Sequence, residues 1–180
     1  TCPPPAAGPN YRPNTTYAAP LYNLSQAYNT RDADAVKAYV GMIGSTFRFR
    51  YYNLQSSTPS WPIYWNAAQE DSAATGMLHD LAISQIHLVL PLADTSSAEV
   101  SSSAGDPPDT RKITIRGITL LVQRGDVSYQ ASGTCDFFIA PVNNEYRIIR
   151  WEDNTAPPQF VSGGSTPVQA TTWGSIKSIY

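Results

Sequence analysis

The stretch from Val127 to Ile139 alternates apolar and polar residues along its whole length. A two-residue period is typical of a half-buried β-strand, because successive side chains point to opposite faces of a sheet. The apolar face carries no acid, no base and no clear metal ligand; its members are Val127, Tyr129, Ala131, Gly133, Cys135, Phe137 and Ile139. The segment therefore predicts a sheet scaffold without a visible reaction centre.

Helices are expected mainly before the long strands. Apolar residues at helical spacing predict two short helices, near 16–29 and 32–42. Asn66 and Gln69 have the spacing of a capping box, which predicts the start of a third helix. The expected buried stripe of that helix is Ala74, Met77, Leu78 and Leu81.

The remaining apolar segments read as strands, expected at 46–51, 83–90, 112–123, 127–140 and 146–151. Helices followed by a run of long strands indicate the α+β class. A long, curved antiparallel sheet wrapped over two to three N-terminal helices would bury the apolar face of each.

Three regions are expected from composition. Residues 1–15 form a proline-rich arm, 16–153 form one α+β domain, and 154–180 form a tail with a short amphipathic segment. Residues 93–111 are rich in Ser, Asp, Gly and Pro, which predicts a long mobile loop. The arm and the tail carry large apolar groups that a neighbouring subunit would cover: Tyr11, Phe160, Trp173, Ile176 and Tyr180.

The chain is low in charge, with 14% charged residues and a net charge of −2. This balance argues against a nucleic-acid surface, which needs clustered Lys and Arg. No run approaches the roughly 20 apolar residues of a membrane span. Low charge and a start at Thr1 without an initiator methionine suggest an exported, processed chain of the cell envelope or outside it, or else a trimmed chain.

The two cysteines, Cys2 and Cys135, allow more than one reading. An exported chain could join them and fix the arm to the sheet. Cys135 could instead be a small core residue, because free cysteine is often buried. Cys2 could carry a lipid anchor, although a lipidated mature chain would begin at the cysteine itself.

Three segments resemble a known superfamily. AYNTRDADAV (27–36) resembles the helical opening of nuclear-transport-factor-two-like proteins, which include ketosteroid isomerases and polyketide cyclases. RIIRWED (147–153) and WGSIKSIY (173–180) resemble the endings of bacterial exported or lipoprotein-type members. The resemblance implies a cone, in which a bent sheet closes over helices around a pocket. In the superfamily's enzymes that pocket holds an acid–base pair.

No residue of this chain matches that acid–base pair. Ser45 and Thr46 stand where the superfamily carries an acid before its first strand, which disfavours an enzyme. His87 and Asp136 are weak catalytic candidates, and a surface histidine and a solvated strand acid are the simpler interpretations. A pocket would be lined by Tyr28, Tyr39, Phe49, Trp65 and Phe137.

The leading hypothesis from sequence is a non-enzymatic exported module that self-assembles as a homo-oligomer through its tails. A binder of a small apolar ligand and a ketosteroid-isomerase-like or cyclase-like enzyme are the alternatives. No cofactor and no metal site is expected, because the two histidines have no further ligand at a suitable spacing.

Overall fold

The computed structural model describes residues 11–51, 63–92, 98–101, 103–156 and 168–180. Its elements follow the expected order of helices and strands. They are α1 (Ala18–Thr30), α2 (Ala35–Met42), β1 (Ile43–Tyr51), β2 (Ile63–Asn66), α3 (Ala67–His79), β3 (Ile83–Val89), β4 (Glu99–Val100), β5 (Arg111–Arg124), β6 (Val127–Val142), β7 (Glu145–Ala156), β8 (Val168–Ala170) and α4 (Trp173–Lys177).

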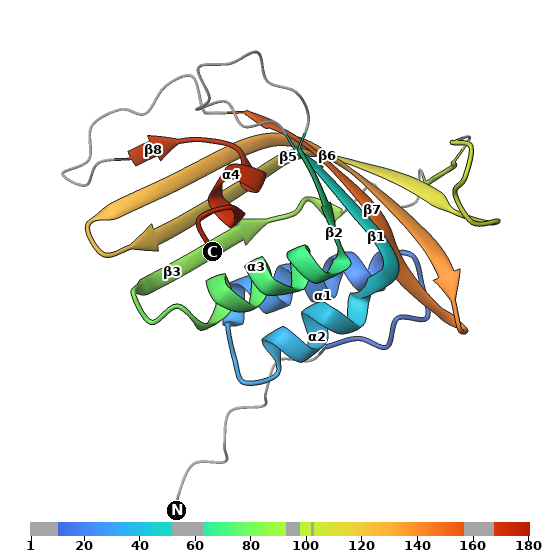
Figure 1. Ribbon diagram of the computed structural model, residues 1–180, viewed down its shortest axis with the longest axis horizontal. Coiled ribbons are helices and arrows are strands. Elements are labelled where there is room, and N and C mark those ends of the chain that lie inside the picture. Colours follow the sequence, from blue (N-terminus) through green and yellow to red (C-terminus); the bar gives the residue numbers. More distant parts are fainter. Residues whose placement is uncertain (1–10, 52–62, 93–97, 102, 157–167) are drawn as a thin grey trace, which may run out of the picture.

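A curved sheet arches over the helices, with β5, β6 and β7 as its long strands (Figure 1). Its order is β2-β1-β7-β6-β5-β3, with β4 added to β5 and β8 added to β6. The β1–β7 and β6–β8 pairings are parallel and the others are antiparallel. The α+β class with a curved, unclosed sheet over N-terminal helices is therefore confirmed.

The curvature has a local cause in β5. The β5–β6 register shifts between Arg116 and Ile118, so Gly117 is an extra residue, and its φ is +71°. An extra residue of this kind bends a strand and increases its twist, and glycine adopts a positive φ without strain. The bend turns the far half of the sheet back over the helices.

Helices α1, α2 and α3 cover the concave face, and one arginine joins two of them to the sheet. Arg31 follows α1 and donates hydrogen bonds to the backbone carbonyls of Leu78, Asp80 and Ile83 at 3.2, 2.7 and 2.7 Å. Since those carbonyls lie at the end of α3 and the start of β3, one side chain fixes the packing of three elements. No helix among the residues described is long and apolar enough to cross a membrane.

The apolar face of β6 forms part of the core as the alternation predicts. Ala131, Cys135, Phe137 and Ile139 are buried in the main core. Phe138 and Ala140 alternate with these residues and therefore point to the opposite face of the sheet. There they pack in a second, smaller cluster with Ile149, which is the extra residue of β7 at the register shift opposite Phe138 and Ile139.

Two expectations about the third helix and the tail are corrected. Helix α3 ends at His79, so Leu81 lies beyond the buried stripe and is 98% exposed.

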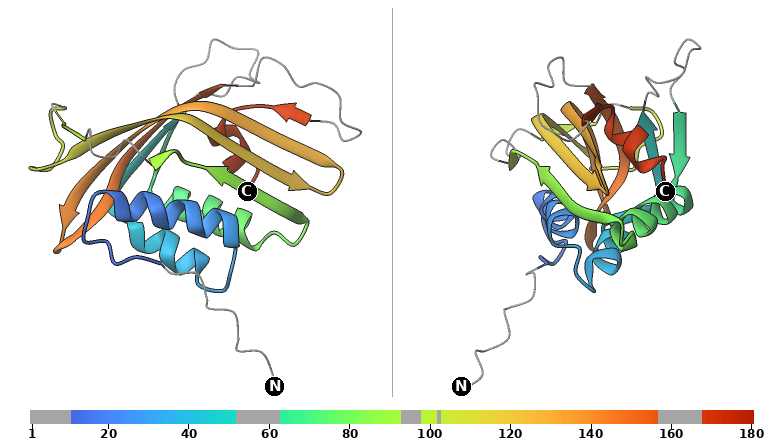
Figure 2. Two further views of the ribbon diagram at one scale, coloured as in Figure 1. Left: turned by 180° about the vertical axis from the view of Figure 1, so that it is seen from behind. Right: turned by 90° about the vertical axis from the view of Figure 1, so that its left-hand side faces the viewer.

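The described end of the tail is part of the cone and not a separate unit. Strand β8 pairs with β6, and α4 lies between the sheet and the helices (Figure 2).

Trp151→Ala should lower the free energy of unfolding by about 3–5 kcal/mol, because truncating a buried aromatic side chain leaves a cavity. Trp151 is fully buried and packs against Phe49, Phe137 and Trp173 at ring-centroid distances of 5.0, 4.9 and 4.4 Å. Urea denaturation measures the loss. Leu81→Ala is the control and should change stability by less than about 0.5 kcal/mol. A Trp151→Ala protein as stable as the wild type would contradict this packing.

Candidate functional site

Helix α4 brings two large side chains into the interior of the cone. Thr172 caps the helix through its Oγ1, which accepts a hydrogen bond from the Ser175 backbone N–H at 3.1 Å. Trp173 and Lys177 are one helical turn apart and both are fully buried. Gly174 allows this close approach, since a Cβ at that position would lie 2.1 Å from Cγ of Tyr51.

The Lys177 ammonium forms a buried ion pair with Glu70 of α3. Lys177 Nζ lies 2.6 Å from Glu70 Oε1, and the Tyr39 hydroxyl donates a hydrogen bond to the same oxygen. Glu70 Oε2 is buried and has no hydrogen-bond partner. Burial lowers the pKa of Lys177, while Glu70 acts in the opposite direction by favouring its charged form. Burial raises the pKa of Tyr39 well above its ordinary value, and the negative charge of Glu70 adds to that rise.

Aromatic rings surround this pair. Lys177 Nζ lies 3.7 Å from the ring centroid of Phe49 and 3.9 Å from that of Trp151, distances at which a cation is attracted by the ring face. Trp173 closes the same space, and its indole N–H donates a 3.3 Å hydrogen bond to the Tyr28 hydroxyl. The surroundings of Lys177 are therefore an aromatic enclosure that also contains the Glu70 carboxylate and the hydroxyls of Tyr28 and Tyr39.

Asp153 of β7 holds the start of α4. Its Oδ2 accepts a 2.6 Å hydrogen bond from the Gly174 backbone N–H, and its Oδ1 accepts from the Thr155 hydroxyl. The Thr155 oxygen in turn accepts a 2.9 Å hydrogen bond from the Trp173 backbone N–H. Burial raises the pKa of Asp153, although these hydrogen bonds favour its ionised form. Burial also raises the pKa of the Cys135 thiol, which lies 3.7 Å from Asp153 Oδ1.

The five residues expected to line a pocket lie close together. Tyr28, Tyr39, Phe49 and Phe137 are fully buried, and Trp65 is half-buried at the edge against Phe49. In this structure their rings pack against one another and against α4. These rings and α4 fill the place where the sequence predicts a pocket, and that the five residues line a ligand site stays a prediction.

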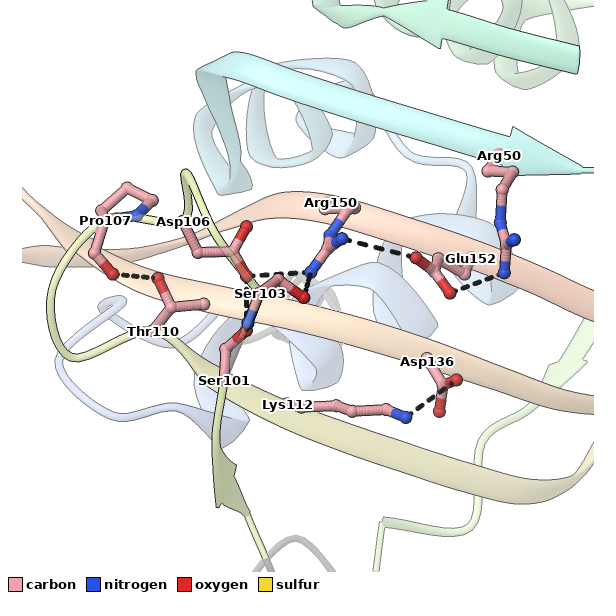
Figure 3. A network of polar contacts seen from close by, with 10 residues as sticks. All are labelled: Arg50, Ser101, Ser103, Asp106, Pro107, Thr110, Lys112, Asp136, Arg150 and Glu152. Atoms are coloured by element: carbon pink, nitrogen blue, oxygen red, sulfur yellow. Dashed lines mark hydrogen bonds and ion pairs between the residues drawn. The ribbon is translucent and has the colours of Figure 1, made fainter.

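The two weak catalytic candidates lie outside this enclosure. His87 is exposed on β3. Asp136 lies on the outer face of the sheet, where it pairs with Lys112 at 3.2 Å. Figure 3 shows Asp136 near a separate outer network, in which Glu152 pairs with Arg50 at 2.7 Å and Arg150 pairs with Asp106 at 2.8 Å. The contacts of Arg150 hold Ser103 and Asp106 against the sheet, and the network needs no catalytic interpretation.

Residues expected at a subunit interface have different positions. Trp173 and Ile176 are fully buried in their own chain, so the expectation that another subunit covers them is corrected. Tyr11 and Tyr180 are half-buried and pack on the same core, and Phe160 lies outside the described residues. Cys135 is a free, buried thiol, and Cys2 also lies outside the described residues.

Sequence patterns did not single out three ionisable side chains that are buried in the interior: Glu70, Asp153 and Lys177. Glu70 continues the buried stripe of α3, since it lies four positions before Ala74. Asp153 alternates with Trp151 along β7, and Lys177 lies one turn after Trp173. The spacing was therefore present in the sequence, although first-turn acids and terminal lysines usually face solvent. Among the described residues no group of three or more His, Cys, Asp or Glu could hold a metal ion.

No protein-family model matches the sequence, and no curated protein matches it either. Solved structures do share its fold. A Novosphingobium aromaticivorans protein named as a scytalone dehydratase is 6% identical, with 82% of this chain and 87% of that chain covered and a TM-score of 0.52. Another from the same organism, named as an aromatic ring hydroxylase, is 13% identical, with coverages of 74% and 81% and a TM-score of 0.51.

These likenesses support the fold and nothing finer. Both neighbours share the α+β architecture of a curved sheet over N-terminal helices that the sequence motifs implied. At 6% and 13% identity, the activities in the names of the two neighbours cannot be transferred to this chain.

Asp153→Asn should change how stability depends on pH. Because the pKa of Asp153 is raised above its ordinary value of 3.8, the folded state holds this proton more tightly than the unfolded state. The stabilisation that protonated Asp153 gives to the folded state is therefore present at low pH, and it is lost as pH rises through the raised pKa. The unfolding free energy of the wild type minus that of Asp153→Asn should fall over that window in urea titrations. Asp136→Asn, on the outer face, is the control for losing a carboxylate. A difference that rises with pH would contradict the assignment.

Proposed function

We propose that this protein binds a small aromatic or apolar molecule inside the cone, in the space that α4 occupies in this structure. The observation that carries the proposal is the position of Trp173 and Lys177. Both come from the last helix of the chain, and both are fully buried in the interior. The helix thus acts as an internal occupant that a ligand would replace.

The walls of this space have the composition of a ligand site. Such sites are mostly apolar and aromatic, with a few polar groups that fix orientation. Here Phe49 and Trp151 supply ring faces, and the Tyr28 hydroxyl accepts the indole N–H of Trp173. A small aromatic ligand with one N–H donor would make the same contact.

Binding is favoured over catalysis because the interior ionisable groups interact with the chain itself. Asp153 accepts the backbone N–H of Gly174, and Lys177 pairs with Glu70. A general acid or base needs a proton-transfer partner in the substrate within hydrogen-bond reach. In this structure α4 occupies the positions from which a substrate would meet these two groups.

Gly174→Ala tests the proposal by forcing α4 out of its place. The new Cβ would lie 2.1 Å from Cγ of Tyr51, a contact that the helix cannot accept without moving. Indole is the probe, since it is the group that Trp173 places in the interior. Calorimetric titration should show indole binding to Gly174→Ala at least about tenfold more tightly than to the wild type, because the open state is more populated.

Gly41→Ala is the matched control, since no atom lies within 4 Å of a Cβ added there. It should bind indole like the wild type. A Gly174→Ala protein that folds but does not bind indole would reject an interior site. One that loses its cooperative fold would show that α4 is an obligatory part of the core, and the proposal would fail.

A second candidate function is a non-enzymatic exported module that assembles through surfaces other than Trp173 and Ile176, which its own core covers. The observation in its favour is that the described interior is packed with fully buried rings, as in a structural core. Export to the cell envelope or beyond it belongs to this proposal and rests on the low charge of the chain. Sedimentation of the purified chain tests assembly, and a monomer at all concentrations excludes it.

A further inference from the structure

We infer that the space around the Lys177 ammonium is a binding site for a primary alkylammonium group, and that Lys177 stands in for the ligand in this structure. This inference rests on the proposed function, because the ligand enters where α4 lies. It goes further by naming the chemical class of the ligand.

The geometry around Nζ is that of an ammonium site. Ring faces lie at 3.7 Å (Phe49) and 3.9 Å (Trp151), and Glu70 Oε1 lies at 2.6 Å. Aromatic faces together with a carboxylate recognise organic cations because the rings attract the charge and the carboxylate neutralises it. The site is shielded from water, because the side chains of Phe49, Trp151, Glu70 and Lys177 are all fully buried.

Glu70 shows that Lys177 does not satisfy the site completely. Its Oε1 takes both the Lys177 ammonium and the Tyr39 hydroxyl, while its buried Oε2 has no hydrogen-bond partner. Buried polar atoms normally have a hydrogen-bond partner, so a donor that reached Oε2 would pair an acceptor that Lys177 leaves unpaired. A free ammonium has three N–H donors and can reach both oxygens, since it is not tied to a helix.

The same distances select against methylated ammonium groups. Carbon atoms in contact are about 3.5–4.0 Å apart. A methyl group on the nitrogen could not be inserted between it and ring centroids that are already at 3.7 and 3.9 Å. Unbranched primary amines therefore fit, with an apolar chain that follows the path of the lysine stem, and tetramethylammonium does not.

The element that carries Lys177 is suited to displacement. Helix α4 has only 5 residues, so it is a single short turn of helix. The competing ammonium is tethered, so the apparent affinity of a free amine is reduced by the fraction of molecules in which α4 is displaced. Removal of the lysine head group should raise that affinity.

The test measures n-butylammonium binding to the full chain by calorimetry at neutral pH. The wild type should bind it measurably, with a blue or red shift in tryptophan fluorescence as Trp173 leaves its 4.4 Å contact with Trp151. Lys177→Ala should bind it at least about tenfold more tightly. Neither n-butanol, which lacks the charge, nor tetramethylammonium should bind to either protein.

The double variant Glu70→Gln, Lys177→Met is the matched control. It replaces a buried ion pair by neutral groups of similar size, a change that proteins often tolerate. It should fold and should not bind n-butylammonium. If Lys177→Ala binds n-butylammonium and the wild type does not, Lys177 is a fixed part of the core and the inference is overturned. Equal binding of n-butanol, or no amine binding by either protein, would also overturn it. Indole binding to Gly174→Ala without any amine binding would reject the ligand class and leave the interior site standing.

Discussion

The docking of α4 against Asp153 is the interaction on which the interior depends. One buried carboxylate accepts the Gly174 backbone N–H and orients Thr155, which accepts the preceding N–H, that of Trp173. These contacts fix where the helix begins. They thereby place Trp173 against Trp151 and the Lys177 ammonium against Glu70. Without them the aromatic enclosure would be open at the end that α4 now closes.

A buried ion pair is a costly way to fill a core. Desolvation of two charges opposes their attraction, and well-packed apolar residues often serve stability as well or better. Glu70 and Lys177 are both fully buried, and one Glu70 oxygen has no hydrogen-bond partner. Such an arrangement is better explained by a site that recognises charge than by a need for stability.

The alternation of β6 and the spacing of α1 and α3 made the cone predictable, because burial on one face imposes a regular period. The burial of Tyr28, Tyr39, Phe49 and Phe137 followed from the same patterns. The position of α4 could not be predicted in this way, because the residues Trp173–Lys177 do not indicate which surface this short helix covers. Its target depends on β8 pairing with β6 and on Asp153, which are contacts between segments distant in sequence.

Hydrogen exchange of the unmodified protein tests most directly whether α4 is a displaceable occupant of the cone. The amides to compare are those of Trp173 and Gly174 with those of Cys135 and Phe137 in the central strand β6. Local opening of α4 predicts that the helix amides exchange at least about tenfold faster, with a lower opening free energy than the sheet. Equal opening free energies for both sets, matching global unfolding, would mean that α4 leaves only when the whole protein unfolds, and would contradict the account.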